Sequence, residues 1–130
     1  MDITSGCAFC AIAAGQAPAV VVRRWETVMA IRPRRGGVTA GHLLVIPHVH
    51  VADVGTCPAT SAEVFAAAAE LAGELPACNV IASRGSAATQ TVGHLHAHVV
   101  PRNAFDGLAL PWTAPPLTSA TAAADLIEVS

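Results

Sequence analysis

The chain has 130 residues, of which 53% are hydrophobic and 12% are charged, and its formal net charge is -2. One domain of this size can bury a substantial core with that apolar content, which excludes an intrinsically disordered chain. The weak charge balance argues against a nucleic-acid polymer as partner and against an acidic interaction tail. Mean hydropathy is +0.53, but no apolar run approaches the roughly 18 residues of a membrane-spanning helix. We therefore expect no membrane association.

The N-terminal half of the chain predicts a short helix followed by three strands. The helix is alanine-rich and ends at Gly15, and the strands are apolar or β-branched runs, of which GHLLVIP is the clearest buried one. The predicted helix covers residues 8–14, and the predicted strands cover residues 20–25, 27–31 and 41–47. A basic loop precedes the third strand, because Pro and Gly alternate there with arginine. Its residues are Arg32, Pro33, Arg34, Arg35, Gly36 and Gly37.

The C-terminal half predicts a long helix and two more strands, which makes the order α+β without internal repeats. A capping box of Thr60, Ser61, Ala62 and Glu63 begins the helix, which continues to Pro76. Strands are expected at 78–82 and 91–100, on either side of a glycine-containing loop at 83–89. We expect one domain over residues 1–112, followed by a Pro/Ala/Thr-rich tail at 113–130.

The start of the sequence predicts a reducing compartment, and two of the four cysteines indicate a metal or redox site there. Asp2 follows Met1 and no basic residue precedes Arg23, so a secretory signal is not expected. We expect a cytoplasmic location, where disulfides are uncommon. Cys7 and Cys10 form a C-x-x-C motif, which in such a compartment indicates a metal clip or a redox pair. The other two cysteines, Cys57 and Cys78, lack such spacing and are expected to be ordinary small side chains.

All six histidines fall in two short stretches, and the chain has no tyrosine or lysine. The stretches hold His42, His48 and His50 in the first, and His94, His96 and His98 in the second. Side chains alternate between the two faces of a strand, so the second stretch predicts a row of three imidazoles with Leu95, Ala97 and Val99 facing a core. Imidazoles bind metals, transfer protons or attack electrophiles near neutral pH. This row is therefore the candidate for chemistry.

The cysteines and histidines together supply a ligand set that suits tetrahedral zinc. Two arrangements are compatible with the spacing. One is a structural zinc held by two cysteines and two histidines, which leaves two histidines of the row available. The other is a zinc held by three histidines that carries a catalytic water. The residues alone leave both open.

These motifs resemble the histidine triad (HIT) superfamily, and in particular its zinc-containing branch of nucleotide-binding hydrolases and transferases. The resemblance covers about residues 7–112 in order. It is carried by Cys7, Cys10 and Gly15, by GHLLVIP at 41–47 with His50, and by QTVGHLHAHVVPR at 90–102.

The resemblance implies an α+β, HIT-like fold in which an antiparallel sheet carries one main helix and a short N-terminal helix, and the chains form homodimers. It implies attack at the α-phosphorus of nucleoside phosphoramidates, nucleotidyl esters or dinucleoside polyphosphates, with a purine nucleotide or nucleotide conjugate as partner. His96 would be the nucleophile and would form a nucleotidyl-histidine, while His98 would hydrogen-bond the phosphate or leaving group. One structural zinc per chain would be held by Cys7, Cys10, His50 and His94. Nucleotide or phosphate contacts would come from Ile31, Ser83, Thr89, Gln90, Thr91 and His98.

The sequence also departs from the family pattern. Ala30 stands at the expected position of an acidic residue that grips the ribose, Ser83 replaces a frequent asparagine, Thr89 a frequent glycine, and Gly93 a bulky residue. With no lysine, Arg102 and the arginines of the basic loop are possible phosphate neighbours. His42 is expected to be structural, and His48 to face solvent or phosphate.

Three functional classes follow. The first is a nucleotide hydrolase or transferase that works through His96. The second is a nucleotide-binding regulatory module with weak or no turnover, because the ribose contacts are changed. The third is a thiol redox protein that uses the C-x-x-C motif, which a stoichiometric metal bound by Cys7 would exclude.

Overall fold

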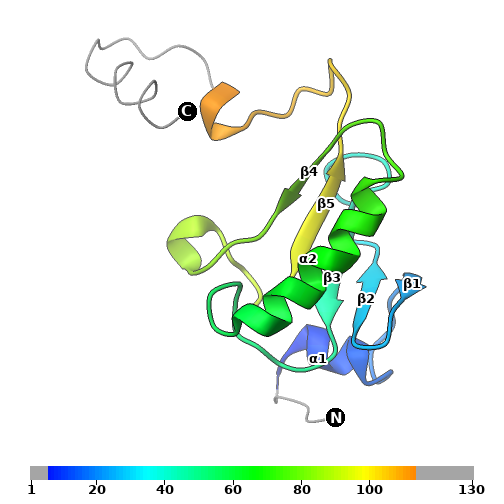
Figure 1. Cartoon of the computed structure of the whole chain (residues 1–130), viewed down its shortest axis with the longest axis vertical. Coiled ribbons are helices and arrows are strands. Elements are labelled where there is room, and N and C mark those ends of the chain that lie inside the picture. Colours follow the sequence, from blue (N-terminus) through cyan, green and yellow to red (C-terminus); the bar gives the residue numbers. More distant parts are fainter. Residues whose placement is uncertain (1–5, 114–130) are drawn as a thin grey trace.

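A five-stranded antiparallel sheet forms the centre of the computed structural model, which describes residues 6–113. The strand order is β1-β2-β3-β5-β4, and α2 crosses one face of the sheet (Figure 1). The elements are α1 (Ala8–Ala13), β1 (Val21–Arg24), β2 (Val28–Ile31), β3 (Leu43–Pro47), α2 (Pro58–Ala72), β4 (Cys78–Ile81) and β5 (Ala97–Pro101), with 3-10 turns at Ser86–Ala88 and Pro111–Thr113. This architecture confirms the predicted α+β class with one main helix and a short N-terminal helix.

The two faces of the sheet carry separate apolar clusters. On one face, α2 buries Val64 and Leu71 against residues that include Ala30 and Val99. On the other face, Phe9 of α1 packs against a smaller cluster. Its sheet residues are Met29, Ile31, Leu44 and Ile46. Within residues 6–113, neither helix is long and apolar enough to cross a bilayer.

The long helix begins earlier than the capping box predicts. Helix α2 starts at Pro58 with Cys57 as its N-cap, and no side chain caps it. Proline suits this position because its missing N–H would lack a helical partner in any case. The Thr60 hydroxyl instead donates to Cys57 Sγ at 3.3 Å, and the Glu63 carboxylate accepts from Thr27 at 2.7 Å. The predicted capping box was therefore wrong.

The last strand is shorter than predicted, since β5 begins at Ala97 and not at residue 91. The backbone N–H of Leu95 bonds to the carbonyl of Val51, in the loop that follows β3, at 2.6 Å. The segment at 91–96 therefore crosses the end of β3 before β5 pairs beside it. The predicted tail lies outside the described residues except for Thr113, so the boundary at residue 112 stays a prediction.

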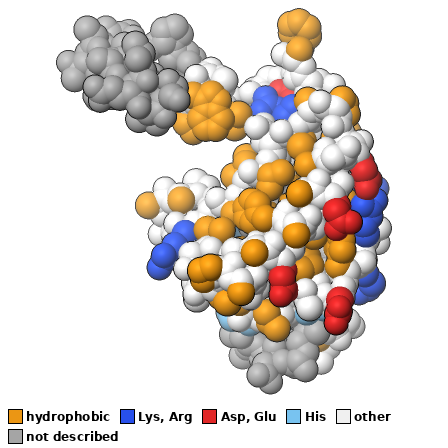
Figure 2. Space-filling model, viewed as in Figure 1, with side chains coloured by type: hydrophobic (Ala, Val, Ile, Leu, Met, Phe, Trp, Pro, Cys, Tyr) orange, Lys and Arg blue, Asp and Glu red, His pale blue; other side chains and the backbone are white. Residues whose placement is uncertain are grey.

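Charged and polar side chains join edge strand β1 and the residue after it to α2 and the turn that follows α2. Arg23 donates to both carboxylate oxygens of Glu74 at 2.6 and 2.9 Å. Trp25 Nε1 donates to Glu70 at 2.7 Å. Figure 2 shows acidic and basic side chains gathered along one side of the molecule. These bonds use exposed groups, so they orient the edge strand more than they stabilise the fold.

Arg102 has a structural role that the sequence analysis did not anticipate. Its guanidinium donates to Asp106 at 2.7 and 3.0 Å, to Asn79 Oδ1 at 2.7 Å and to the carbonyl of Leu108 at 2.8 Å. The guanidinium and two backbone N–H donors hold the pKa of Asp106 far below its usual range. Nε and both terminal nitrogens of Arg102 are thus engaged within the protein, which favours a structural role over phosphate binding.

Candidate active site and metal cluster

The three histidines of the second stretch project from the sheet face opposite α2. Leu95, Ala97 and Val99 are buried in the cluster under α2. The rings of His96 and His98 lie 5.2 Å apart between centroids, at an interplanar angle of 70°. The alternation expected for this stretch is confirmed, although only His98 lies within β5.

His96 is held in one tautomer by the backbone. Its Nδ1 lies 2.8 Å from the carbonyl oxygen of His94. A carbonyl oxygen only accepts, so Nδ1 carries the hydrogen and the lone pair is on Nε2. The ring is half-buried, and the edge of Phe9 approaches it with centroids 5.2 Å apart. A nitrogen lone pair in a fixed position is what a nucleophile requires.

Phe9 is a residue of this site that the sequence analysis missed. It lies on α1 between the two cysteines of the C-x-x-C motif, and its ring also meets the His94 ring at a centroid distance of 5.8 Å. These T-shaped contacts of the Phe9 ring with His94 and His96 pack α1 against the histidine row. The aromatic residue inside an otherwise alanine-rich helix was the signal that could have identified it.

His98 is ordered by a chain of hydrogen bonds through His42. The backbone N–H of Val38 donates to His42 Nδ1 at 3.1 Å. His42 Nε2 therefore carries the hydrogen in the neutral ring, and it lies 2.9 Å from His98 Nδ1. His98 accepts on Nδ1, so its own hydrogen is on Nε2. The chain makes His98 a donor on Nε2, and His42, expected to be structural, becomes part of the site.

Both rings of this pair favour the neutral form. Burial lowers the pKa of His42. Burial, assisted by the neighbouring His96 and His42, lowers the pKa of His98 to about 4. At neutral pH, His98 is therefore a neutral hydrogen-bond donor and not an imidazolium acid.

The predicted metal ligands come together in one cluster beside the histidine row. One ligand atom from each of four residues lies within 4.8 Å of the other three. These residues are Cys7, Cys10, His50 and His94. The shortest distances are 3.2 Å between Cys10 Sγ and His50 Nδ1, and 3.4 Å between Cys7 Sγ and His94 Nδ1. Tetrahedral zinc places sulfur and nitrogen ligands about 3.6 Å apart.

The surroundings of the cluster also fit a metal ion. His94 is fully buried, and its Nε2 lies 3.0 Å from the carbonyl oxygen of Pro47. That bond places the hydrogen on Nε2 and leaves Nδ1 as the ligand atom. Burial raises the pKa of the Cys7 thiol, and a bound dication would favour its thiolate. Two sulfur and two nitrogen donors can therefore hold zinc, and this ligand set leaves His96 unused.

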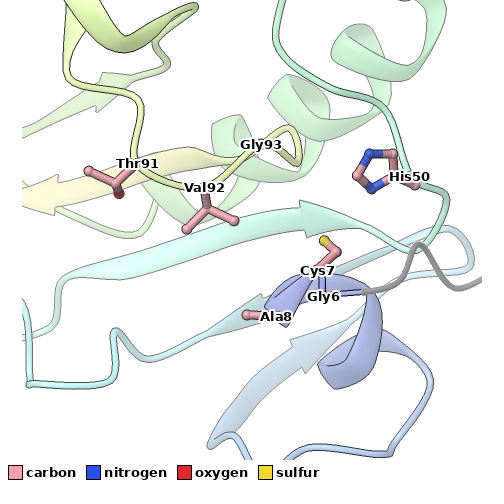
Figure 3. Close-up of a pocket in the computed structure, with 7 residues that line it drawn as sticks. All are labelled: Gly6, Cys7, Ala8, His50, Thr91, Val92 and Gly93. Carbon is pink, nitrogen blue, oxygen red and sulfur yellow. The ribbon is translucent and has the colours of Figure 1, made fainter.

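A cavity of about 370 Å³ opens beside the cluster. Figure 3 shows Cys7 and His50 on one side of it and Thr91, Val92 and Gly93 along the other. Of the predicted phosphate-binding residues, only Thr91 lines it. The cavity joins the metal cluster to the segment that leads into the histidine row.

Three other predicted phosphate-binding residues, Ser83, Thr89 and Gln90, lie in the loop before that segment. Gln90 Oε1 accepts from the Gly85 N–H at 2.8 Å, and its Nε2 donates to the carbonyls of Ala52 and Val92 at 2.9 and 3.0 Å. The side-chain amide of Gln90 therefore holds this loop in place through its oxygen and both of its N–H donors. Thr89 is exposed and has a φ of 67°, a left-handed conformation that favours glycine. Ser83 is half-buried, and Thr91 is exposed.

Ile31 and Ala30 point to opposite faces of the sheet. Ile31 is buried in the cluster with Phe9 and Leu44, on the histidine side. Ala30 is fully buried under α2, in the cluster that holds Val64. The Ala30 side chain therefore faces away from the histidines, and its correspondence to the acidic residue that grips the ribose stays a prediction. The first exposed residue after β2 is Arg32.

His48 stays outside the histidine row. Its Nε2 is buried and has no hydrogen-bond partner among the described residues. Burial and the nearby Arg24 lower its pKa. The expectation that His48 faces solvent or phosphate does not match this buried nitrogen.

Comparisons with known proteins show the family to which the chain is similar. The family model described as the HIT domain matches residues 14–105. The chain is 36% identical over 114 residues to an uncharacterized HIT-like protein of Mycobacterium tuberculosis, which covers 80% of this chain and 76% of the relative. It is 29% identical over 119 residues to the adenosine 5′-monophosphoramidase HNT1 of Saccharomyces cerevisiae, covering 86% and 73%.

A solved structure provides the third comparison. A Zn-bound histidine triad family protein from Mycobacterium smegmatis superposes with a TM-score of 0.74 at 35% identity, covering 95% of each chain. Both the sequence and the fold of this chain are therefore similar to those of histidine triad proteins. The chain belongs to the histidine triad (HIT) family.

Proposed function

We propose that the chain is a nucleotide hydrolase or nucleotidyl transferase that attacks the α-phosphorus of purine nucleoside phosphoramidates or dinucleoside polyphosphates through His96. The observation that carries the proposal is the 2.8 Å bond between His96 Nδ1 and the carbonyl of His94, which leaves the Nε2 lone pair for attack. The similarity to a yeast adenosine 5′-monophosphoramidase supports the substrate class.

The first step forms a bond between His96 Nε2 and phosphorus and breaks the bond from phosphorus to the leaving group. The leaving group departs with the electron pair and takes a proton from water. His98, with its hydrogen on Nε2, donates a hydrogen bond to a phosphoryl or leaving-group oxygen or nitrogen, where negative charge develops. It stays neutral, because its pKa is about 4.

The second step returns the enzyme to its starting form. Water attacks phosphorus and the bond to His96 Nε2 breaks, with its electron pair returning to the ring. The attacking water releases one proton to solvent. The His94 carbonyl holds the hydrogen on Nδ1 throughout, so the imidazole leaves in the tautomer in which it attacked.

Turnover of adenosine 5′-phosphoramidate and of diadenosine tetraphosphate tests this proposal. His96→Ala should lower kcat by about a thousandfold or more, because no other group replaces a nucleophile. His48→Ala is the matched histidine control and should keep turnover. Equal turnover by wild type and His96→Ala on both substrates contradicts the proposal. Nucleotide binding without turnover by the wild type would support the regulatory module instead.

The cluster of two cysteines and two histidines would hold one structural zinc per chain. The metal would cross-link α1 to the segments around His50 and His94 when bound. This cross-link would fix the carbonyl of His94, and through it the His96 ring. The zinc-bound relative supports this assignment.

We also propose that the chain forms a homodimer and is located in the cytoplasm. Strand β4 is an edge of the sheet, and Ile81 on it is 39% exposed. An exposed edge strand can pair with a second copy. Light scattering coupled to size-exclusion chromatography would measure the mass in solution, and a monomer at micromolar concentration would contradict the dimer.

A further inference from the structure

The loop after β2 concentrates positive charge that the fold does not neutralise. All seven basic residues of the chain are arginines, and three of them are Arg32, Arg34 and Arg35, which are exposed. Among residues 6–113, ion pairs form at Arg23, Arg84 and Arg102, but no carboxylate lies within 4.0 Å of a loop arginine. The sequence holds no Asp or Glu between Glu26 and Asp53. The loop therefore carries three charges without a protein counter-ion in the described part of the chain.

The loop is packed against the hydrogen-bonded pair of His42 and His98. Gly37 has a φ of +78°, and a Cβ at this position would lie 2.4 Å from His42 Nδ1. The next residue, Val38, donates its N–H to the same nitrogen at 3.1 Å. The Thr39 hydroxyl donates to the carbonyl of Pro101 at 2.8 Å, so the loop lies beside the C-terminal end of β5 (Figure 1). The His42 ring thus fixes where the loop backbone runs.

The register of the sheet relates the arginines to His98. Ile31 pairs with Leu44, which pairs with His98 on its other side. Two strand spacings separate Ile31 from His98, which is about 10 Å between backbones. Arg32 follows Ile31 directly, and Arg35 is two residues before Gly37, at most about 7.6 Å away between Cα atoms. The arginines therefore lie around the His98 end of the histidine row, whereas the metal cluster lies at the His94 end.

We propose that this arginine loop, residues 32–37, is a subsite for a second phosphate group on the nucleotide, in addition to the phosphorus that His96 attacks. The inference rests on the proposed function and deepens it by naming the substrate class as nucleotides with an additional phosphate. Guanidinium groups bind phosphate through paired N–H donors and stay charged at any physiological pH. Since the chain has no lysine, these arginines are its densest source of such donors. The second phosphate could be carried by a ribose hydroxyl or could follow the first in a 5′-polyphosphate chain.

Calorimetric titration of the full chain separates these two sources. The ligands are AMP, adenosine 2′,5′-bisphosphate, adenosine 3′,5′-bisphosphate and ADP. At low salt, at least one of the last three should bind about tenfold more tightly than AMP. A gain for the bisphosphates assigns the subsite to the ribose phosphate, and a gain for ADP assigns it to the polyphosphate chain. Salt of about 1 M, with a screening length of about 3 Å, should reduce the gain.

Variants then test whether the loop produces the gain. In Arg32→Gln/Arg34→Gln/Arg35→Gln the affinity ratio should fall to about one, while AMP affinity changes by less than about threefold. Arg34→Lys/Arg35→Lys keeps the charges and should retain part of the gain. Arg24→Gln, at the other end of β1, is the matched control and should leave the ratio unchanged.

Three results overturn the inference. They are a ratio near one for every second phosphate in the wild type, a ratio that persists in the triple variant, and an equal loss in Arg24→Gln. In each case AMP still binds, so the proposed function survives. Failure of AMP itself to bind would contradict the proposed function together with the inference.

Discussion

Nε2 of His42 and Nδ1 of His98 lie 2.9 Å apart, and the hydrogen between them belongs to His42. The assignment follows from Val38, whose backbone N–H occupies the other nitrogen of the His42 ring. A backbone amide in the loop before β3 thus sets the tautomer of a side chain on β5. Since hydrogen-bond direction decides whether His98 donates or accepts, the loop is coupled to the proposed chemistry.

Two substitutions of His42 distinguish its hydrogen bond with Val38 from its hydrogen bond with His98. His42→Asn keeps an acceptor near Nδ1 for Val38 and removes the donor to His98, so kcat should fall by about tenfold to a hundredfold with little change in KM. His42→Gln places an amide N–H near the Nε2 position and should restore part of kcat. Steady-state kinetics on adenosine 5′-phosphoramidate measures both. Equal losses in the two variants would show that His42 only fills space.

The ionisation of His98 gives a prediction about pH. Its pKa is lowered to about 4, whereas an unfolded chain has a histidine pKa of about 6.5. The neutral native ring therefore stabilises the fold fully above about pH 6.5, and this contribution is lost as the pH falls through about 4. Nitrogen-resolved NMR should show His98 neutral with its hydrogen on Nε2 at pH 6. A midpoint near 6.5 for His98 would contradict the buried pair.

Two adjacent glycines allow a matched test of the loop position. Gly36 and Gly37 have φ values of +82° and +78°, so alanine at either costs about 1–2 kcal/mol in backbone strain. Only at Gly37 would the new Cβ meet His42, at 2.4 Å from Nδ1, whereas Gly36 has nothing within 4 Å. Gly37→Ala should therefore lower kcat as His42→Asn does.

Gly36→Ala, the control for this test, should lower thermal stability but keep kcat. Kinetics and melting temperatures of the two variants provide the comparison. If both variants lose stability and neither loses kcat, the contact between the loop and His42 has no part in turnover.

The sequence predicted the features that depend on local spacing. The period-two alternation of His94, His96 and His98 is visible without a structure, and so is the C-x-x-C motif, because neighbouring side chains fix both. The hydrogen bond between His42 and His98 could not be predicted, since it depends on the pairing of β3 with β5, in which Leu44 lies opposite His98. The partner of Arg102 had a local signal in Asp106, four residues further along the chain.

Predictions failed, or could not be made, where burial does not distinguish the two faces of a strand or where a residue distant in the sequence supplies the hydrogen-bond partner. All four residues of β2 are buried, so their burial does not reveal which face Ala30 occupies. The sheet packs α2 on one face and α1 on the other, and only that arrangement assigns the faces. The capping box failed because Glu63 bonds to Thr27, at the turn between β1 and β2. The strand that holds His98 starts late because Val51 takes the backbone N–H of Leu95.

Substitution of one cysteine tests the proposed metal site against the redox alternative. The wild type, purified without chelator, should contain one zinc per chain by metal analysis. Cys7→Ser removes a thiolate ligand, and a hundredfold weaker affinity corresponds to about 2.7 kcal/mol of lost stabilisation. Cys78→Ser is the control, because Cys78 is on β4, outside the cluster. The stabilisation by metal is the difference in unfolding free energy without and with chelator. It should fall by this amount in Cys7→Ser and keep the wild-type value in Cys78→Ser. A wild type that carries no zinc after growth with the metal, or equal zinc content in the two variants, would contradict the cluster as a metal site.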